Sequence, residues 1–201
     1  MKKNMRKKIR FPFVPLFLSG FLTGMLLPNM AWKLHWQEDT LGLYYMLRTF
    51  SIENTLGKTY FLTILSERGS WFLFCAICGF SIFGLPLAVL WSVGMGIAIG
   101  AILTMPILQF GFSGGILGLS VLVPHYFFYL PALCIQASLM SRQSGYIWSG
   151  TYKGTQALKE SAKCWWPSGG TAALLWFLGI VSECFLNLPL LKKIIEITGI
   201  F

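Results

Sequence analysis

Apolar residues dominate the middle of this chain, and charged residues are confined to its flanks. Between Arg68 and Arg142 lie 73 consecutive residues without one Asp, Glu, Lys or Arg. The helices of a small soluble domain keep a polar face, whereas a charge at the centre of a bilayer costs about 2.5–3.5 kcal/mol on insertion scales. The pattern therefore predicts an integral membrane protein.

Apolar segments long enough to cross a bilayer are separated by clusters of glycine and proline. A helix needs about 20 residues to span about 30 Å of hydrocarbon. The runs predict five spans, at about 11–31, 70–91, 93–110, 115–140 and 170–191, with an outer loop at 32–69 and an inner loop at 141–169. We expect a single integral membrane domain over 1–201: an all-α, polytopic membrane helix bundle of about five transmembrane helices, with spans broken by Pro and Gly.

The first apolar run follows a group of basic residues, which leaves two interpretations. A cleavable signal peptide has this order of basic and apolar segments. The run at 11–31 is long, however, and no small-x-small cleavage site follows it. Trp32 and Trp36 come next, where aromatic residues anchor a helix at the interface. We therefore expect an uncleaved helix.

Lysine and arginine are distributed unevenly between the expected loops. The formal net charge of +9 is compatible with nucleic-acid binding, but six cations precede the first span, as in an anchor against an anionic leaflet. We expect membrane lipid and no nucleic acid as a partner. The inner side holds ten cations, the six N-terminal ones plus Arg142, Lys153, Lys159 and Lys163, and the outer side holds Lys33, Arg48, Lys58, Arg68, Lys192 and Lys193. This bias predicts a multi-pass protein of the cell membrane with a cytosolic N-terminus and an extracytoplasmic C-terminus.

Cysteine and histidine give no sign of metal or cofactor chemistry. The five cysteines are an odd number, and Cys75-x-x-Cys78 lies in an apolar setting, where two small packed residues are the simpler interpretation. Only Cys164 is expected outside the membrane, on the cytosolic side. The sequence has no Cys/His cluster with metal-ligand spacing, so we expect no metal and no cofactor.

Glycines recur at helix-contact spacing within the apolar runs. Small residues four apart allow helix backbones to approach closely in lipid. The packing glycines expected on this basis are Gly20, Gly24, Gly94, Gly96, Gly100 and Gly111. Packing within the chain is the preferred interpretation, and a partner-binding face is the alternative.

A few polar residues fall inside the apolar runs, close to prolines. The prolines Pro86, Pro106, Pro124 and Pro131 are expected to interrupt the spans. The intramembrane polar residues are His125, Gln109, Gln136 and Glu183. His125 could pair with Glu183 or with Gln109. An intramembrane histidine is a candidate functional residue, and a satisfied interhelical hydrogen bond is the alternative.

The sequence lacks the known arrangements for catalysis. No span holds a pair of carboxylates, and no nucleophile elbow, metalloprotease helix or phosphate-binding glycine loop occurs. We therefore expect no catalytic residue and no enzymatic activity.

The segment His125-Tyr-Phe-Phe-Tyr-Leu-Pro-Ala132 resembles a family signature. It is similar to the His-Gly-x-x-Glu-Leu-Pro-Ala element of the stage II sporulation protein M family. Four positions agree, namely His125, Leu130, Pro131 and Ala132. Tyr126 stands where Gly is usual and Tyr129 where Glu is usual. Upstream, Gly84-Leu-Pro86, the glycines at 94, 96 and 100, and Gln109-x-Gly111 follow a similar order.

The resemblance implies a small membrane protein of the engulfment machinery in endospore-forming bacteria. There it would anchor a peptidoglycan-degrading complex with stage II sporulation proteins D and P, and the wall chemistry would belong to those partners. The loss of the motif's Glu argues against a role for a His–Glu pair within the motif and leaves a scaffold role intact. The alternative function is a membrane permease or transporter component, with a path lined by His125 and broken helices.

Overall fold

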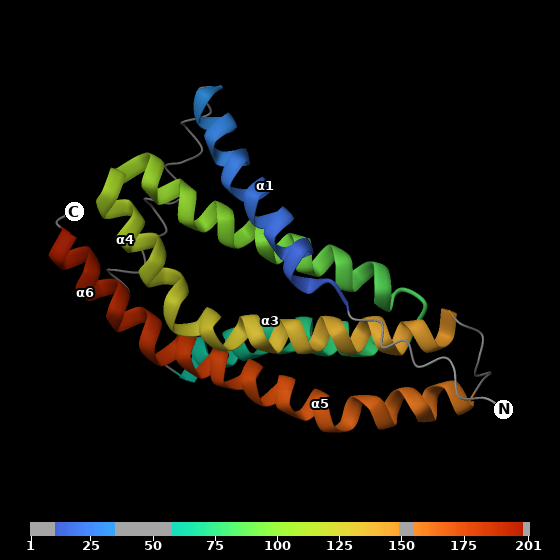
Figure 1. The fold of residues 1–201 in the computed structure, drawn as a ribbon. Coiled ribbons are helices and arrows are strands. Elements are labelled where there is room, and N and C mark those ends of the chain that lie inside the picture. Colours follow the sequence, from blue (N-terminus) through green and yellow to red (C-terminus); the bar gives the residue numbers. More distant parts are fainter. Residues whose placement is uncertain (1–10, 35–57, 149–154, 199–201) are drawn as a thin grey trace.

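The computed structural model describes residues 11–34, 58–148 and 155–198, and within these ranges every element is a helix. The elements are α1 (Phe13–Lys33), α3 (Lys58–Gly79), α4 (Gly84–Trp148), α5 (Thr155–Ser182), the π-helical turn η2 (Glu183–Asn187) and α6 (Leu188–Thr198) (Figure 1). The all-α class is confirmed for the described residues. Most of the expected outer loop, 35–57, and the side chain of Cys164 lie outside them.

Four of the described helices are long and apolar enough to cross a membrane, so the expected count of about five is not confirmed. They are Phe13–Lys33, Tyr60–Gly79, Gly84–Trp148 and Trp165–Asn187. The third, α4, has 65 residues, or about 97 Å of helix at about 1.5 Å per residue. That is about three times the thickness of the hydrocarbon core.

Helix α4 changes direction at Gly111. This residue has φ 61 and ψ −136, a backbone conformation that a side chain would strain. Figure 1 shows α4 running to one end of the molecule and returning from there. Its two legs, 84–110 and 112–148, pack against each other beside the reversal: a Cβ at Gly114 would overlap the Pro106 carbonyl oxygen. Each leg exceeds the length needed to cross a bilayer.

The span expected at 70–91 is wrong, because it joins parts of two helices. α3 ends at Gly79, residues 80–83 form a turn, and α4 begins at Gly84. The turn has an apolar sequence, Phe80-Ser-Ile-Phe83, so hydropathy does not mark it. Its polar groups are satisfied by the rest of the chain: the carbonyl oxygen of Ile82 accepts hydrogen bonds from Ser144 and Trp148 at 3.1 and 2.9 Å.

The expected loops are shorter than the sequence suggested. Residues 58–69, expected in the outer loop, are the first half of α3, and residues 141–148 and 155–169 of the expected inner loop extend α4 and α5. Charged residues at 58, 67, 68 and 142 led to the wrong boundaries. Helices continue through them because tertiary packing overrides the local cost of a charge.

None of the four prolines expected to break the spans ends a helix, although Figure 1 shows α4 bending again within its second leg. Pro106, Pro124 and Pro131 lie inside α4, and Pro86 lies in its first turn, where the missing N–H group has no intrahelical partner to lose. Neighbouring helices can satisfy the backbone groups that an internal proline frees. The interruptions are at Gly111 and at η2 instead.

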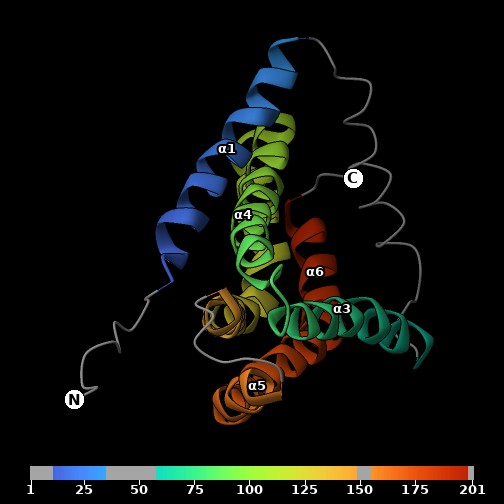
Figure 2. The same cartoon turned by 90° about the vertical axis from the view of Figure 1, so that its right-hand side faces the viewer.

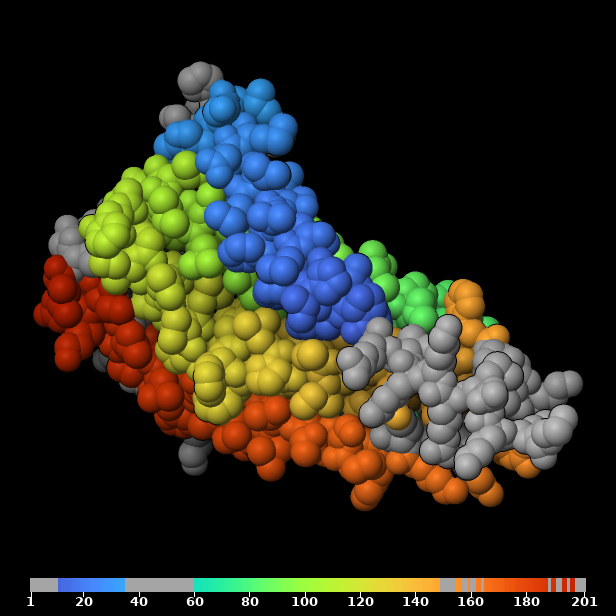
Figure 3. Space-filling model, in the orientation of Figure 1, coloured from blue at the N-terminus to red at the C-terminus, as the bar shows by residue number. Residues whose placement is uncertain are grey.

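Helix α1 packs on the first leg of α4 through glycines on both helices. A Cβ at Gly20 would overlap the carbonyl oxygen of Val93, and one at Gly24 would overlap that of Ile97. In return, Gly96 and Gly100 lie against the backbone of α1. A step of four residues along α1 matches a step of four in the same direction along α4, so the two helices run parallel. Figure 3 shows α1 packed over α4.

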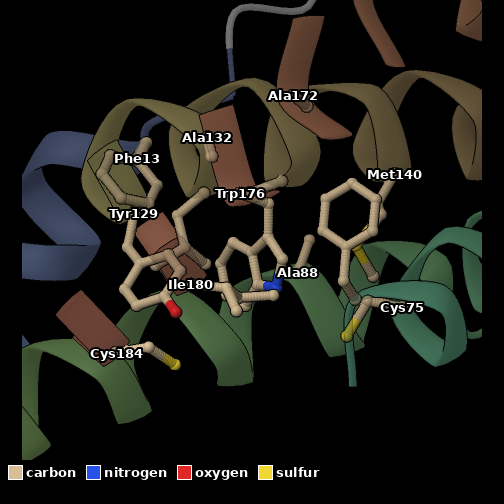
Figure 4. Close-up of a cluster of buried hydrophobic side chains, with 13 residues drawn as sticks. Phe13, Cys75, Ala88, Tyr129, Ala132, Met140, Ala172, Trp176, Ile180 and Cys184 are labelled. Atoms are coloured by element: carbon tan, nitrogen blue, oxygen red, sulfur yellow. The ribbon is translucent and has the colours of Figure 1, made fainter. Parts of the chain in front are cut away.

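The core lies where α3, α5 and both legs of α4 meet. Trp176 of α5 stacks near Tyr129 of α4 with ring centroids 4.6 Å apart, and Phe72 of α3 lies 5.5 Å from Trp176. Small residues such as Cys75 and Ala88 complete this cluster (Figure 4). Large apolar side chains point outward instead, for example Leu22, Leu90, Phe127 and Phe177. This distribution suits a lipid environment, where apolar side chains gain nothing from burial and small residues favour helix contact.

We predict that a large side chain in the glycine contact separates α1 from the first leg of α4. The change Gly96→Leu should lower the thermal unfolding midpoint of the purified protein, since overpacking costs about 1–3 kcal/mol and here the obstacle is backbone. Gly94→Leu is the matched control: Gly94 lies two residues away, is exposed and has no neighbour within 4 Å. Equal midpoints for the two variants would contradict the glycine-mediated packing.

Candidate intramembrane polar site

A widened helical turn carries the acidic residue of this site. After Ser182, α5 continues as the five-residue π-helical turn η2, which starts at Glu183. Such turns insert one extra residue into a helix and are frequent at functional sites. Glu183 is buried, although it lies in a segment apolar enough to cross a membrane. A carboxylate in this position needs partners inside the protein.

Arg68 of α3 is the cationic partner of Glu183. Its Nη2 lies 3.0 Å from Oε1 of Glu183. The side chain of Arg68 is 42% exposed and that of Glu183 is 10% exposed, so the pair is half buried. The sequence interpretation missed Arg68, because it was assigned to the outer loop. The sequence feature that could have pointed to Arg68 is Glu183, because a carboxylate in lipid requires a cation.

Tyr129 of α4 completes the site from the other side. Its hydroxyl donates a hydrogen bond of 2.8 Å to Oε2 of Glu183, so both carboxylate oxygens have a partner. Gly179 makes room for the tyrosine ring, which a Cβ at that position would overlap. The indole N–H of Trp176 donates to the carbonyl oxygen of Arg68 at 3.0 Å. Arg68, Glu183 and Tyr129, here named the polar lock, therefore connect α3, α5 and α4.

The other residues of the family motif lie close to the lock without joining it. His125 is buried one turn before Tyr129, and their rings are 5.6 Å apart. The expected hydrogen bond from His125 to Glu183 or Gln109 is not formed, because Tyr129 and Arg68 occupy Glu183, and His125 Nδ1 has no partner. Leu130 is half-buried and Pro131 is exposed.

Two buried glutamines lie on the same face of α4 as Tyr129. Gln136 and Gln143 follow Tyr129 at intervals of seven residues, which is two helical turns each time. Both are fully buried, and neither the oxygen nor the nitrogen of either amide has a hydrogen-bond partner. The Gln143 oxygen lies against Gly79, at the end of α3. Gln109, at the end of the first leg, also has an unpartnered oxygen.

The remaining predicted site residues are glycines with different surroundings. Gly20, Gly24, Gly96 and Gly100 lie in the contact between α1 and α4. Gly94 faces outward and has no neighbour within 4 Å, and Gly111 forms the reversal of α4. The family-motif histidine and these glycines are therefore not brought together in one site.

The chemistry available to the polar lock is electrostatic. The guanidinium group of Arg68 compensates the charge of Glu183, and the phenol of Tyr129 donates a hydrogen bond to it. In the described part of the chain, no three His, Cys, Asp or Glu side chains lie close enough together to hold a metal ion. Removing one member of a buried ion pair leaves an uncompensated charge and costs more than the pair itself contributes. The lock therefore makes the relative positions of the three helices interdependent.

Comparison with known proteins gives one match. The family model of stage II sporulation protein M matches residues 13–187. The matched part runs from the start of α1 to the end of η2, and so includes the polar lock. No curated protein matches. No solved structure matches either.

We predict that the polar lock behaves as a coupled unit in a double-mutant cycle. Arg68→Met should destabilise the purified protein by up to about 3 kcal/mol, less than for a fully buried pair, because it leaves the Glu183 carboxylate without its cation while Arg68 is itself 42% exposed. Adding Glu183→Gln should recover much of this loss. Thermal unfolding in one detergent, for the two single variants and the double variant, measures the coupling.

The control for this cycle is Arg142→Met, which removes an exposed arginine near the end of α4. Its effect should be small and additive with that of Glu183→Gln. If Arg68→Met and Glu183→Gln were also additive, the ion pair would not couple α3 to α5.

Proposed function

Because the chain belongs to the stage II sporulation protein M family, we propose that it is an integral membrane scaffold that anchors a peptidoglycan-remodelling complex during forespore engulfment. The observation that supports this proposal is the polar lock, which ties three helices together by an ion pair and a hydrogen bond. A scaffold must hold its partners in fixed positions. A bundle joined by mutually dependent polar contacts meets that requirement better than one whose helices slide.

In this proposal the protein is not itself an enzyme. The wall chemistry belongs to its partners, which by the family resemblance are stage II sporulation proteins D and P. The chain contributes helix surfaces within the bilayer and positions that chemistry at the membrane. The only carboxylate of the site is fully engaged by Arg68 and Tyr129, which supports this division of labour.

We further propose five crossings, with the N-terminus in the cytosol. α1 and the first leg of α4 run parallel. This is required if α3, which lies between them in the sequence, crosses the membrane in the opposite direction. Figure 1 shows that α5 runs in the same direction as α1 and the first leg of α4, and that the second leg of α4 runs in the opposite direction. The excess of Lys and Arg on the expected inner side, ten against six, supports a cytosolic N-terminus.

A transporter component is the second candidate function, and a specific observation favours it. The buried polar atoms of His125, Gln136 and Gln143 lack partners in the described bundle. Unpartnered polar groups are costly in an apolar interior, and water or a polar solute could satisfy them. His125, which the motif supplies, would then line a path along the second leg of α4.

One experiment separates the two functions. A tagged chain purified from sporulating cells should bring down a peptidoglycan hydrolase complex, and deletion of the gene should prevent that complex from assembling. In proteoliposomes the pure protein should show no solute flux, and His125→Ala should behave like Phe127→Ala, a lipid-facing control that is 76% exposed. Solute flux that His125→Ala abolishes and Phe127→Ala preserves would show that the protein is a transporter component and not a scaffold.

A further inference from the structure

The two faces of α3 differ in their surroundings. On one face Phe72, Cys75 and Ala76 are buried against the rest of the bundle. Figure 2 shows α3 at the margin of the molecule, so its other face is not covered by the described helices. On that side Trp71 is 61% exposed. The uncovered face faces lipid if α3 crosses the membrane.

The first half of this uncovered face is polar. Ser66, Glu67 and Ser70 are all exposed, and they lie on one side of the helix because residues three and four apart are neighbours. The serine hydroxyl at 70 is used within the helix, since it donates to the backbone carbonyl of residue 67 at 3.0 Å. Farther along, the face becomes apolar at Phe74 and Ile77.

Glu67 carries a charge that the described residues do not compensate. No ion pair or hydrogen bond reaches its carboxylate in this part of the chain. Arg68 is adjacent in sequence, but neighbouring residues do not face each other on a helix, and Arg68 is bound to Glu183. Glu67 lies seven residues, or about 10 Å, from the start of the apolar span Tyr60–Gly79 and twelve residues, or about 18 Å, from its end. A glutamate this far inside a spanning helix requires a cation within the bilayer.

Small residues surround Glu67 and permit close approach of another helix. Ser66 and Ser70 are four apart, the spacing at which Gly20 and Gly24 of α1 pack on α4. The spacing that the chain uses between α1 and α4 is therefore present on α3 without a partner among the described helices.

We propose that this face of α3 docks a transmembrane helix of a partner protein, with a Lys or Arg of that helix opposite Glu67. The proposal rests on the scaffold function and names the chemistry of one of its contacts. Charge complementarity selects the partner: an apolar helix or a lipid tail leaves Glu67 uncompensated, whereas a basic side chain between the two serines neutralises it. The same pairing of an acid with a cation holds Glu183 inside the bundle.

The test uses the full chain in native membranes, with a photo-crosslinking amino acid at Ser70. The same amino acid at Leu174, which is 61% exposed on α5, is the positional control. Position 70 should crosslink to a membrane protein with a basic residue in a span, and position 174 should not. In otherwise unchanged chains, Glu67→Lys should reduce that crosslink at least tenfold. Glu196→Lys, the same charge change at an exposed site on α6, should leave it unaltered.

Charge reversal gives the decisive result. Replacing the identified basic residue of the partner by Glu should restore the crosslink to Glu67→Lys. Glu67→Gln should weaken the crosslink without changing the thermal midpoint of the chain, which separates lost docking from lost folding. Failure of the charge reversal to restore the crosslink would overturn the proposal.

Other crosslinking outcomes also overturn it. Crosslinks to residues 35–57 of the same chain, to a second copy or to lipid alone would each replace the partner helix by another occupant. If the hydrolase complex copurifies equally with Glu67→Lys and with the unaltered chain, the docking site is wrong and the scaffold function stands. If the unaltered chain recovers no complex, the scaffold function fails with it.

Discussion

The structure depends on one constraint: lipid does not solvate a charge, so the carboxylate buried in this bundle must be met by groups of the chain itself. Glu183 shows the consequence most clearly. Its two carboxylate oxygens are met by Arg68 and Tyr129 from two other helices, and a π-helical turn presents it to them. Because a lone charge would be costly there, each of these helices stabilises the placement of the others. The three-helix core and the environment of the motif histidine follow from this contact.

In lipid, the usual relation between the size of an apolar side chain and its burial is reversed. Large apolar residues such as Leu90 and Phe127 point outward, where lipid solvates them, and glycines occupy the contact between α1 and α4. In the family motif, Tyr129 stands where the resemblance placed a glutamate, yet a carboxylate is still present, supplied by Glu183 of a different helix. Glu183 therefore places an acid beside the motif although it lies 54 residues beyond Tyr129 in the chain.

Much of this organisation could be predicted from composition and spacing, and the failures have physical causes. The uncharged middle of the chain and the family motif identified a helical membrane protein of this family, which the family match confirms. The boundary at Gly79 could not be found, because the turn of residues 80–83 is as apolar as the helices beside it. The pairing of Arg68 with Glu183 joins residues 115 apart, and nothing local in the sequence records it. Arg68 instead suggested a loop, because the carboxylate that accounts for its charge inside a span, Glu183, is distant in the sequence.

The most direct measurement determines on which side of the membrane the two ends of the first leg of α4 lie. Single cysteines would replace Phe83 and Phe112, which are 72% and 88% exposed, in a chain whose five native cysteines are serine. In the proposed topology the first leg of α4 crosses the membrane outward and the chain reverses at Gly111. An impermeant thiol reagent should then label position 112 in intact cells and position 83 only in inverted vesicles. Labelling of both positions from the same side would show that this leg does not cross the membrane, and would contradict the account.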